Sequence, residues 1–368
     1  MGLLGLSGCG SPSSASVEMS SQTELVKTGS MELQYAENFA VDYYEDGYKM
    51  LTTLPDSKRY LLVPEGQPVP RGLDEDVSIL QEPLQNIYLV ASGAMDMFAS
   101  LDAVDQIRFS GQKQENWYIQ TAKDAMAAGD MIYAGKYSKP DYELLVSEGC
   151  DLAIENRMIT HSPEVVEMLQ SFGIPVMIEY SSYEQHPLGK VEWVKFFGAL
   201  TGKEAEAEEA FAEQTEILEK VERGEKTGKT IAFFYVTSNG LIQVRQSTDY
   251  IPKLIELAGG RYIFEDLEDS GSGRSTLNMQ VEDFYAGAKD ADILIYNSSI
   301  DGGVTTLDEL IGKCNILKDF KALQEGQVYC TTNDMYQQSM AIGYLLQDMH
   351  TVLTDDDTAK LRYLFLLQ

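Results

Sequence analysis

The stretch from Thr201 to Arg223 constrains the fold more than any other part of the chain. Its mostly apolar residues recur at steps of three and four, which places them on one face of an α-helix. These residues are Ala207, Ala210, Phe211, Gln214, Ile217, Leu218 and Val221. Thr201 and Glu204 have the spacing of a capping box, and Gly224 is a typical stop signal. The pattern predicts a helix of about 20 residues, or about 30 Å.

Short apolar runs alternate with amphipathic stretches on both sides of this helix, over residues 79–200 and again over 229–353. Such alternation is typical of largely parallel sheets that are covered by helices on both faces. We therefore predict an α/β fold with two Rossmann-like lobes, mainly parallel sheets and one long backbone helix that joins them. The alternative is that residues 201–223 form an ordinary surface helix of one large domain.

The alternation also predicts where the lobes, the linking helix and the N-terminal tether begin and end. They are a leader and flexible tether at 1–30, an N-terminal α/β lobe at 31–200, the linking helix at 201–224 and a C-terminal α/β lobe at 225–368. Within the first lobe, residues 31–77 resemble a section of short strands with a turn at Asp46-Gly47.

The N-terminal residues Leu6-Ser7-Gly8-Cys9 resemble the lipobox of bacterial lipoproteins. Small residues before the cysteine let a peptidase approach, and the cysteine thiol receives the lipid. A Ser-rich segment of the kind found in flexible tethers follows. The segment before Cys9 is shorter than a full signal peptide, so we expect a truncated start. We predict that Cys9 carries a lipid anchor on the outer side of the cell membrane.

The composition limits the partners and the chemistry. The chain has 58 acidic and 28 basic residues, a net charge of −30, which argues against nucleic acid and against charge-driven binding to anionic lipid. The four cysteines form no CxxC pair, and the three histidines form no HExxH motif. No G-x-S-x-G motif occurs either. We predict a monomer with no catalytic residues, no metal site and no cofactor.

Several phrases of the chain follow one another in a familiar order. They are IYLVASGAMDMFASLDAVDQI from Ile87, YELLVSEGCDLAI from Tyr142, IPKLIELAGG from Ile251 and VEDFYAGAKDADILIY from Val281. Over roughly Ile87 to Leu353 the chain resembles the substrate-binding lipoproteins of ABC importers, in the class with a helical backbone between the lobes. That class takes up iron–siderophore complexes, haem, cobalamin and sometimes oxyanions. The resemblance implies a binding protein that works with a permease and is not an enzyme.

By the same resemblance, Glu143 and Glu282 occupy the places of two glutamates that enter arginine pockets on the permease, one from each lobe. A carboxylate on each lobe at a fixed separation would supply both attraction and register. Without the resemblance they are acids in the first turn of a helix, where the helix dipole favours them. The chain departs from the family at Gly149-Cys150-Asp151, where Pro-Asp is usual, and residues 31–77 have no counterpart.

Ligands of parallel α/β sheets bind at the carboxyl ends of the strands. The candidate ligand-binding residues near these ends are Ser92, Trp117, Tyr118, Arg157, Tyr183, Tyr235, Arg245 and Tyr336. Aromatic rings with a few arginines suit a flat, partly apolar, anionic ligand, such as a ferric siderophore, haem or a corrinoid. For each residue alone, packing into the core or placement on the surface is the alternative.

These observations predict an extracytoplasmic binding protein of an ABC importer that captures a chelated-metal compound between its lobes. One alternative is a molybdate-like oxyanion-binding protein of the same family. Others are a metallocluster or chelatase enzyme on the same fold, and a surface haem relay without a permease. We also expect only a small closure on ligand binding, because one helix resists bending more than crossing strands do.

Overall fold

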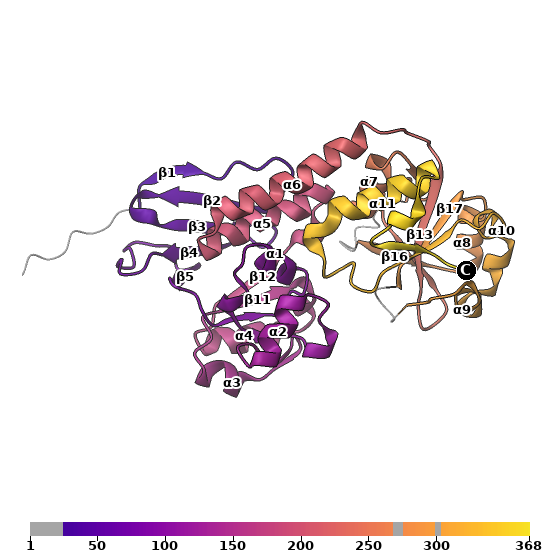
Figure 1. Cartoon of the computed structure of the whole chain (residues 1–368). Coiled ribbons are helices and arrows are strands. Elements are labelled where there is room, and N and C mark those ends of the chain that lie inside the picture. The colour runs from indigo at the N-terminus through magenta and orange to yellow at the C-terminus, as the bar shows by residue number, and fades with distance from the viewer. Residues whose placement is uncertain (1–24, 268–274, 299–302) are drawn as a thin grey trace, which may run out of the picture.

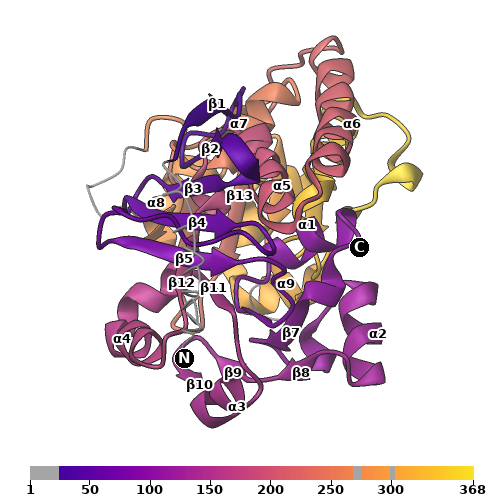
Figure 2. The same cartoon turned by 90° about the vertical axis from the view of Figure 1, so that its left-hand side faces the viewer.

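The computed structural model describes residues 25–267, 275–298 and 303–368. In this part of the chain, an N-terminal sheet and two α/β lobes surround a pair of packed helices (Figures 1 and 2). The N-terminal lobe lies below these helices in Figure 1, and the C-terminal lobe lies at their right-hand end. The predicted two-lobed α/β fold is confirmed.

The N-terminal lobe is built on a five-stranded sheet in which all neighbouring strands are parallel. Its strands, in spatial order, are β12 (Val176–Glu179), β11 (Leu152–Asn156), β6 (Ile87–Leu89), β7 (Ile107–Ser110) and β8 (Ile132–Tyr133). Its helices are α1 (Ala94–Ser100), α2 (Gln120–Ala128), α3 (Tyr142–Ser147) and α4 (Pro163–Ser171). A small ribbon of β9 (Gly135–Lys136) and β10 (Lys139–Pro140) precedes α3. The strands are apolar nearly throughout because side chains on both faces are buried.

The C-terminal lobe contains a seven-stranded mixed sheet. Its order is β16 (Thr276–Met279), β14 (Ile242–Arg245), β13 (Thr230–Val236), β17 (Ile293–Tyr296), β18 (Val328–Thr331) and β19 (Leu364–Leu366), with β15 (Arg261–Tyr262) also paired to β13. Its helices are α7 (Tyr250–Leu257), α8 (Val281–Ala288), α9 (Leu307–Lys313), α10 (Lys321–Gln324) and α11 (Ile342–Thr354). The inner strands β13, β17 and β18 are parallel, whereas β14, β16 and β19 pair antiparallel. Parallel pairing is therefore found among β13, β17 and β18 and between β13 and the short β15.

The N-terminal section forms a five-stranded sheet of its own, in which only the last pair of strands is parallel. Its strands are β1 (Lys27–Ser30), β2 (Phe39–Tyr44), β3 (Lys49–Thr53), β4 (Lys58–Val63) and β5 (Val77–Gln81). The predicted turn is confirmed, since Asp46 and Gly47 both have positive φ, at 58° and 86°. The assignment of residues 27–30 to a tether is wrong, because they form β1.

Two long helices connect the lobes. α5 (Pro187–Thr201) is buried along nearly its whole length, and α6 (Glu204–Glu222) packs beside it. The close approach needs Gly198, because a Cβ there would lie 2.6 Å from that of Ala207. The predicted capping box is wrong: Thr201 ends α5, and its hydroxyl donates to the Phe197 carbonyl at 2.7 Å. The Thr-x-x-Glu spacing is present, but the chain before it is already helical.

One apolar core extends through the N-terminal sheet, both lobes and the helix pair. It includes Phe39 of β2, Leu89 of β6, Trp193 of α5, Phe211 of α6 and Leu346 of α11. Separate clusters fill the outer faces of the two lobe sheets. Among the described helices, none is both long and apolar enough to cross a membrane.

Two buried carboxylates of the α5 region hold the N-terminal sheet in place. Glu192 accepts hydrogen bonds of 2.8 to 3.1 Å from the backbone N–H groups of residues 34–36. Glu184 accepts from the N–H groups of Glu37 and Asn38 and from the Trp193 indole, at 2.8 to 3.0 Å. The segment between β1 and β2 is therefore tied to the helix that links the lobes.

Replacing Glu192 with alanine is expected to lower the free energy of unfolding by about 3 kcal/mol, because several backbone N–H groups lose their acceptor in a buried place. Urea denaturation would measure the loss. Glu208→Ala is the control, since Glu208 is 62% exposed and its ion pair with Lys195 is expected to contribute about 1 kcal/mol or less. Equal stability of the two variants would contradict this role for Glu192.

Candidate ligand-binding site

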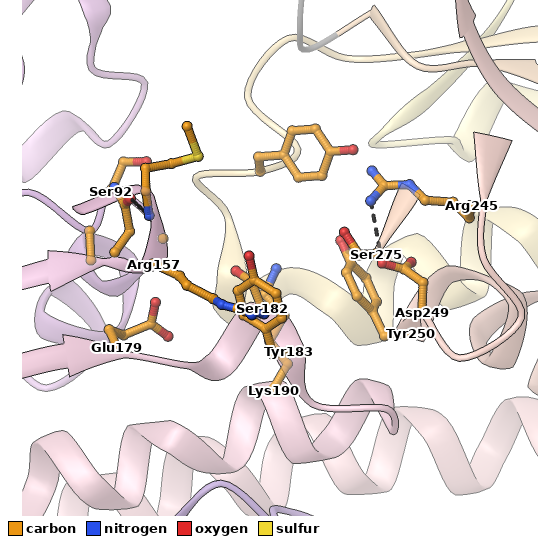
Figure 3. A pocket seen from close by; sticks show the side chains of 15 residues that line it. Ser92, Arg157, Glu179, Ser182, Tyr183, Lys190, Arg245, Asp249, Tyr250 and Ser275 are labelled. Carbon is orange, nitrogen blue, oxygen red and sulfur yellow. Dashed lines mark hydrogen bonds and ion pairs between the residues drawn. The ribbon is translucent and has the colours of Figure 1, made fainter. Parts of the chain in front are cut away.

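A cavity of about 260 Å³ lies where the two lobes face each other above α5 (Figure 3). The residues that line it are Ala91, Ser92, Gly93, Asn156, Arg157, Met158, Glu179, Ser182, Tyr183, Lys190, Arg245, Asp249, Tyr250, Ser275 and Tyr336. The N-terminal lobe contributes the segments that follow β6, β11 and β12. The carboxyl ends of these parallel strands meet at one edge of the sheet, as expected for a binding site of this fold class.

The N-terminal side of the cavity presents an arginine stacked on a tyrosine. Arg157 begins a 3₁₀ turn directly after β11, and Asn156 caps this turn by accepting the Met158 N–H at 2.9 Å. The Arg157 guanidinium lies 4.6 Å from the ring centroid of Tyr183, which follows β12. This distance is that of a cation–π contact. The stack fixes the orientation of the guanidinium, which lies in the lining of the cavity.

The C-terminal side presents a second arginine in a more crowded setting. Arg245 ends β14, forms an ion pair of 3.3 Å with Asp249 and lies 5.5 Å from the ring centroid of Tyr336. Asp249 also caps α7 by accepting the Ile251 N–H at 2.9 Å. The Tyr336 hydroxyl oxygen accepts from the Asn297 side-chain amide at 2.6 Å, which leaves the hydroxyl proton available to a ligand.

The floor of the cavity is formed by Lys190 of α5 and Tyr250 of α7. The Lys190 ammonium lies 4.8 Å from the Tyr250 ring centroid. With both arginines, the cavity contains three cations against two carboxylates, Glu179 and Asp249. Burial raises the pKa of both carboxyls above the ordinary value, and the neighbouring cations offset part of this effect. The arrangement is suited to binding an anion that carries apolar parts.

Five of the eight predicted ligand-binding residues line the cavity: Ser92, Arg157, Tyr183, Arg245 and Tyr336. The other three do not. Trp117 is buried in the core and donates from Nε1 to the Ser110 hydroxyl at 3.0 Å. The Tyr118 ring is exposed, with the Lys123 ammonium 5.8 Å from its centroid. Tyr235 packs against the outer core of its sheet, because side chains alternate between the two faces of a strand.

Sequence reasoning missed the cavity residues that lie inside secondary structure. Glu179 is the last residue of β12, whereas Lys190 and Tyr250 lie on α5 and α7. Sequence patterns place ligand-binding residues in the loops that follow parallel strands, and these three residues are not in such loops. One signal was present: Lys190 stands in the largely apolar stretch PLGKVEWVKFF, where a charged side chain needs a partner.

Polar contacts join the lobes beside the cavity. The Gln337 side-chain amide donates to the Asn116 carbonyl and accepts the Tyr118 N–H, both at 2.8 Å. The Met340 N–H donates to the Asp96 carboxylate of α1 at 2.7 Å. Burial raises the pKa of Asp96 to about 6. The small closure predicted from the linking helix stays a prediction, and these contacts favour it.

The two predicted permease-contact residues, Glu143 and Glu282, do not line the cavity. Glu143 is exposed in the first turn of α3, and Glu282 is exposed in the first turn of α8. Cys9 lies outside the described residues. Within the described residues, no group of three or more His, Cys, Asp or Glu side chains is placed to hold a metal ion.

The curated proteins that this chain is similar to include two uncharacterized lipoproteins of Methanocaldococcus jannaschii. One is 24% identical and covers 87% of this chain and 81% of the relative. The other is 25% identical and covers 84% of this chain and 79% of the relative. No protein-family model matches the chain.

Solved structures with a similar fold include a possible iron-binding, periplasmic solute-binding protein of Staphylococcus epidermidis, with a TM-score of 0.57, 17% identity, and coverage of 73% of this chain and 98% of that one. The periplasmic haem-binding protein HutB of Vibrio cholerae has a TM-score of 0.58, 14% identity, and the same coverage. An ABC-type Fe³⁺-hydroxamate transport protein of Saccharomonospora viridis has a TM-score of 0.56, 16% identity, and coverage of 73% and 93%. The chain therefore has the two-lobed fold of periplasmic solute-binding proteins.

Proposed function

We propose that this chain is an extracytoplasmic solute-binding protein that captures an anionic, chelated-metal compound between its lobes and delivers it to an ABC permease. The observation that carries the proposal is the convergence of Arg157, Lys190 and Arg245 on one inter-lobe cavity in a chain with a net charge of −30. The three cations can bind the negative charge of a ligand, and the tyrosine rings beside them can pack against its flat, apolar parts.

The comparisons support the class of ligand and the location. The similar structures are described as iron-binding, haem-binding or Fe³⁺-hydroxamate transport proteins. The curated relatives are described as lipoproteins, which agrees with a lipid anchor on Cys9. Anchoring would keep the binding protein near its permease.

One observation favours a second candidate, a small oxyanion such as molybdate. The cavity volume of about 260 Å³ lies just below the range of about 300 to 1,000 Å³ that is usual for ligand pockets. A tetrahedral oxyanion would fit inside it, whereas haem or a corrinoid would extend beyond it toward solvent.

Calorimetric titration with haem, cobalamin, a ferric catecholate siderophore, a ferric hydroxamate siderophore and molybdate tests the proposal. One chelate is expected to bind with Kd below roughly 10 μM, about −7 kcal/mol. Arg157→Ala is expected to weaken binding about tenfold or more. Arg108→Ala is the control, because Arg108 binds Glu148 and backbone carbonyls away from the cavity. Binding of molybdate alone would favour the second candidate, and binding of none would refute the chelated-metal proposal.

A further inference from the structure

Lys190 on the cavity floor is a buried cation for which the described residues provide no ion-pair or hydrogen-bond partner. Its side chain comes from α5 and is only 3% exposed. Among the described residues, no hydrogen-bond acceptor or carboxylate oxygen lies within bonding distance of its ammonium group, which instead lies 4.8 Å from the centroid of the Tyr250 ring. An ammonium group has three N–H donors, and those of Lys190 belong to a side chain that lines the cavity.

The second buried lysine of the same helix, Lys195, has its charge compensated by ion pairs. Lys195 is 4% exposed, and its ammonium forms ion pairs with Glu192 at 3.5 Å and with Glu208 at 3.0 Å. Lys190 lies about one and a half turns nearer the start of the helix and has no ion pair with any residue that the structure describes. The difference between the two lysines is that only Lys190 lines the cavity.

Three carboxyls surround Lys190 at longer range. Its charge lowers the pKa values of Glu179, Asp249 and Asp96, in each case offsetting part of the increase that burial causes. Their negative charge compensates the ammonium in part, but within the described residues none of the three forms an ion pair or a hydrogen bond with it; each accepts from a backbone N–H group instead, at 2.6 to 2.9 Å. Lys190 therefore keeps its donors for a group that enters the cavity.

We propose that Lys190 determines ligand specificity by binding an anionic oxygen group of the cargo, such as a carboxylate, a catecholate oxygen or an oxyanion. This inference rests on the proposed function and deepens it. Figure 3 shows Lys190 between the N-terminal lobe residues Ser92, Arg157 and Glu179 and the C-terminal lobe residues Arg245 and Asp249. Because α5 links the two lobes, this contact fixes the ligand on the floor while the two arginines bind it from the sides.

The first test uses selenate, a tetrahedral oxyanion that is located in crystals by its anomalous scattering. Crystals of the wild type and of Lys190→Met would be soaked under the same conditions. Selenate is expected within hydrogen-bond distance of Lys190 in the wild type and absent from the cavity of the variant. Lys190→Gln provides a second neutral variant if Lys190→Met does not fold. Selenate found only on the outer surface of the wild type would overturn the proposal.

The second test separates ligand binding from a purely structural role as a counter-ion for the buried carboxyls. Titrations with haem, the ferric siderophores and molybdate would compare the wild type, Lys190→Gln, Lys190→Arg and Lys195→Met. About a tenfold or greater loss of affinity in Lys190→Gln, partial rescue in Lys190→Arg and wild-type affinity in Lys195→Met are expected. A structural role alone would lower the melting temperature of Lys190→Gln and leave the affinity unchanged.

The two tests also distinguish this inference from the function on which it rests. Selenate bound at Lys190 without binding of any chelate would support the anion site and remove chelated metal as the cargo. A chelate that binds the wild type and Lys190→Gln equally well would support the function and refute the role of Lys190.

Discussion

Glutamine in place of Glu155 is expected to make the protein more stable than the wild type in alkaline solution, with little difference in mild acid. Glu155 is part of β11, is fully buried, and neither of its carboxyl oxygens has a hydrogen-bond partner among the described residues. Burial raises the pKa of this carboxyl from 4.5 to about 8. The folded protein therefore contains a neutral acid at pH 7.

The direction of the pH effect follows from this raised pKa. The folded state binds the proton more tightly than the unfolded state, so the contribution to stability is fully present below pH 4.5 and is lost as the pH rises through about 8. A difference of roughly 3.5 pKa units corresponds to about 5 kcal/mol, and structural relaxation with entry of water would reduce this to about 2–4 kcal/mol. Glutamine has nearly the same shape and does not ionise, so it removes this loss.

Urea denaturation at intervals between pH 5 and pH 9 measures the effect. The unfolding free energies of wild type and Glu155→Gln are expected to be close at pH 5 and to separate progressively toward pH 9. Glu167→Gln is a suitable control, because Glu167 is exposed on α4 of the same lobe. Parallel curves for the wild type and Glu155→Gln would show that this carboxyl is ionised in the folded state or finds a partner there.

The two lobes could be predicted because each strand and helix carries its own periodicity. Residues 152–154 of β11 and 231–236 of β13 form continuous apolar runs, and such runs are visible in the sequence. The hairpin of α5 and α6 could not be predicted, since it depends on Gly198 fitting against Ala207 and on Gly202 adopting a left-handed conformation. The first is a tertiary contact and the second is a backbone dihedral angle, and neither produces a periodic pattern in the sequence.

The candidate site was predictable where its residues follow a strand and not where they lie in a helix. Arg157 and Tyr183 lie at strand ends, and the topology of a parallel sheet brings such ends together. Lys190 and Tyr250 reach the cavity because of how α5 and α7 pack. The prediction for Trp117 was wrong although this residue comes after a strand. Its ring lies in the core, where its indole N–H donates to the Ser110 hydroxyl.

Alanine at both Glu143 and Glu282 is expected to abolish most ligand uptake while leaving ligand affinity unchanged. Each glutamate is exposed in the first turn of a helix, one on each lobe. Neither carboxylate has an ion-pair partner among the described residues, so both are available to cationic pockets on a permease. Loss of a charge pair at an interface costs about 2 kcal/mol or more, and 1.4 kcal/mol is a factor of about ten in affinity. Each single variant should therefore weaken permease binding by about tenfold or more.

Uptake of the bound chelate by cells that lack the native protein measures this effect, and calorimetry checks that the double variant still binds its ligand. Glu164→Ala with Asp308→Ala is the matched control, because these acids are also exposed in the first turns of helices, one on each lobe. If the control variant supports wild-type uptake and the Glu143→Ala, Glu282→Ala variant does not, the permease contacts these two specific carboxylates. An equal loss in both double variants would mean that the permease responds to the overall acidity of the surface. Undiminished uptake without Glu143 and Glu282 would remove the permease from the proposed function.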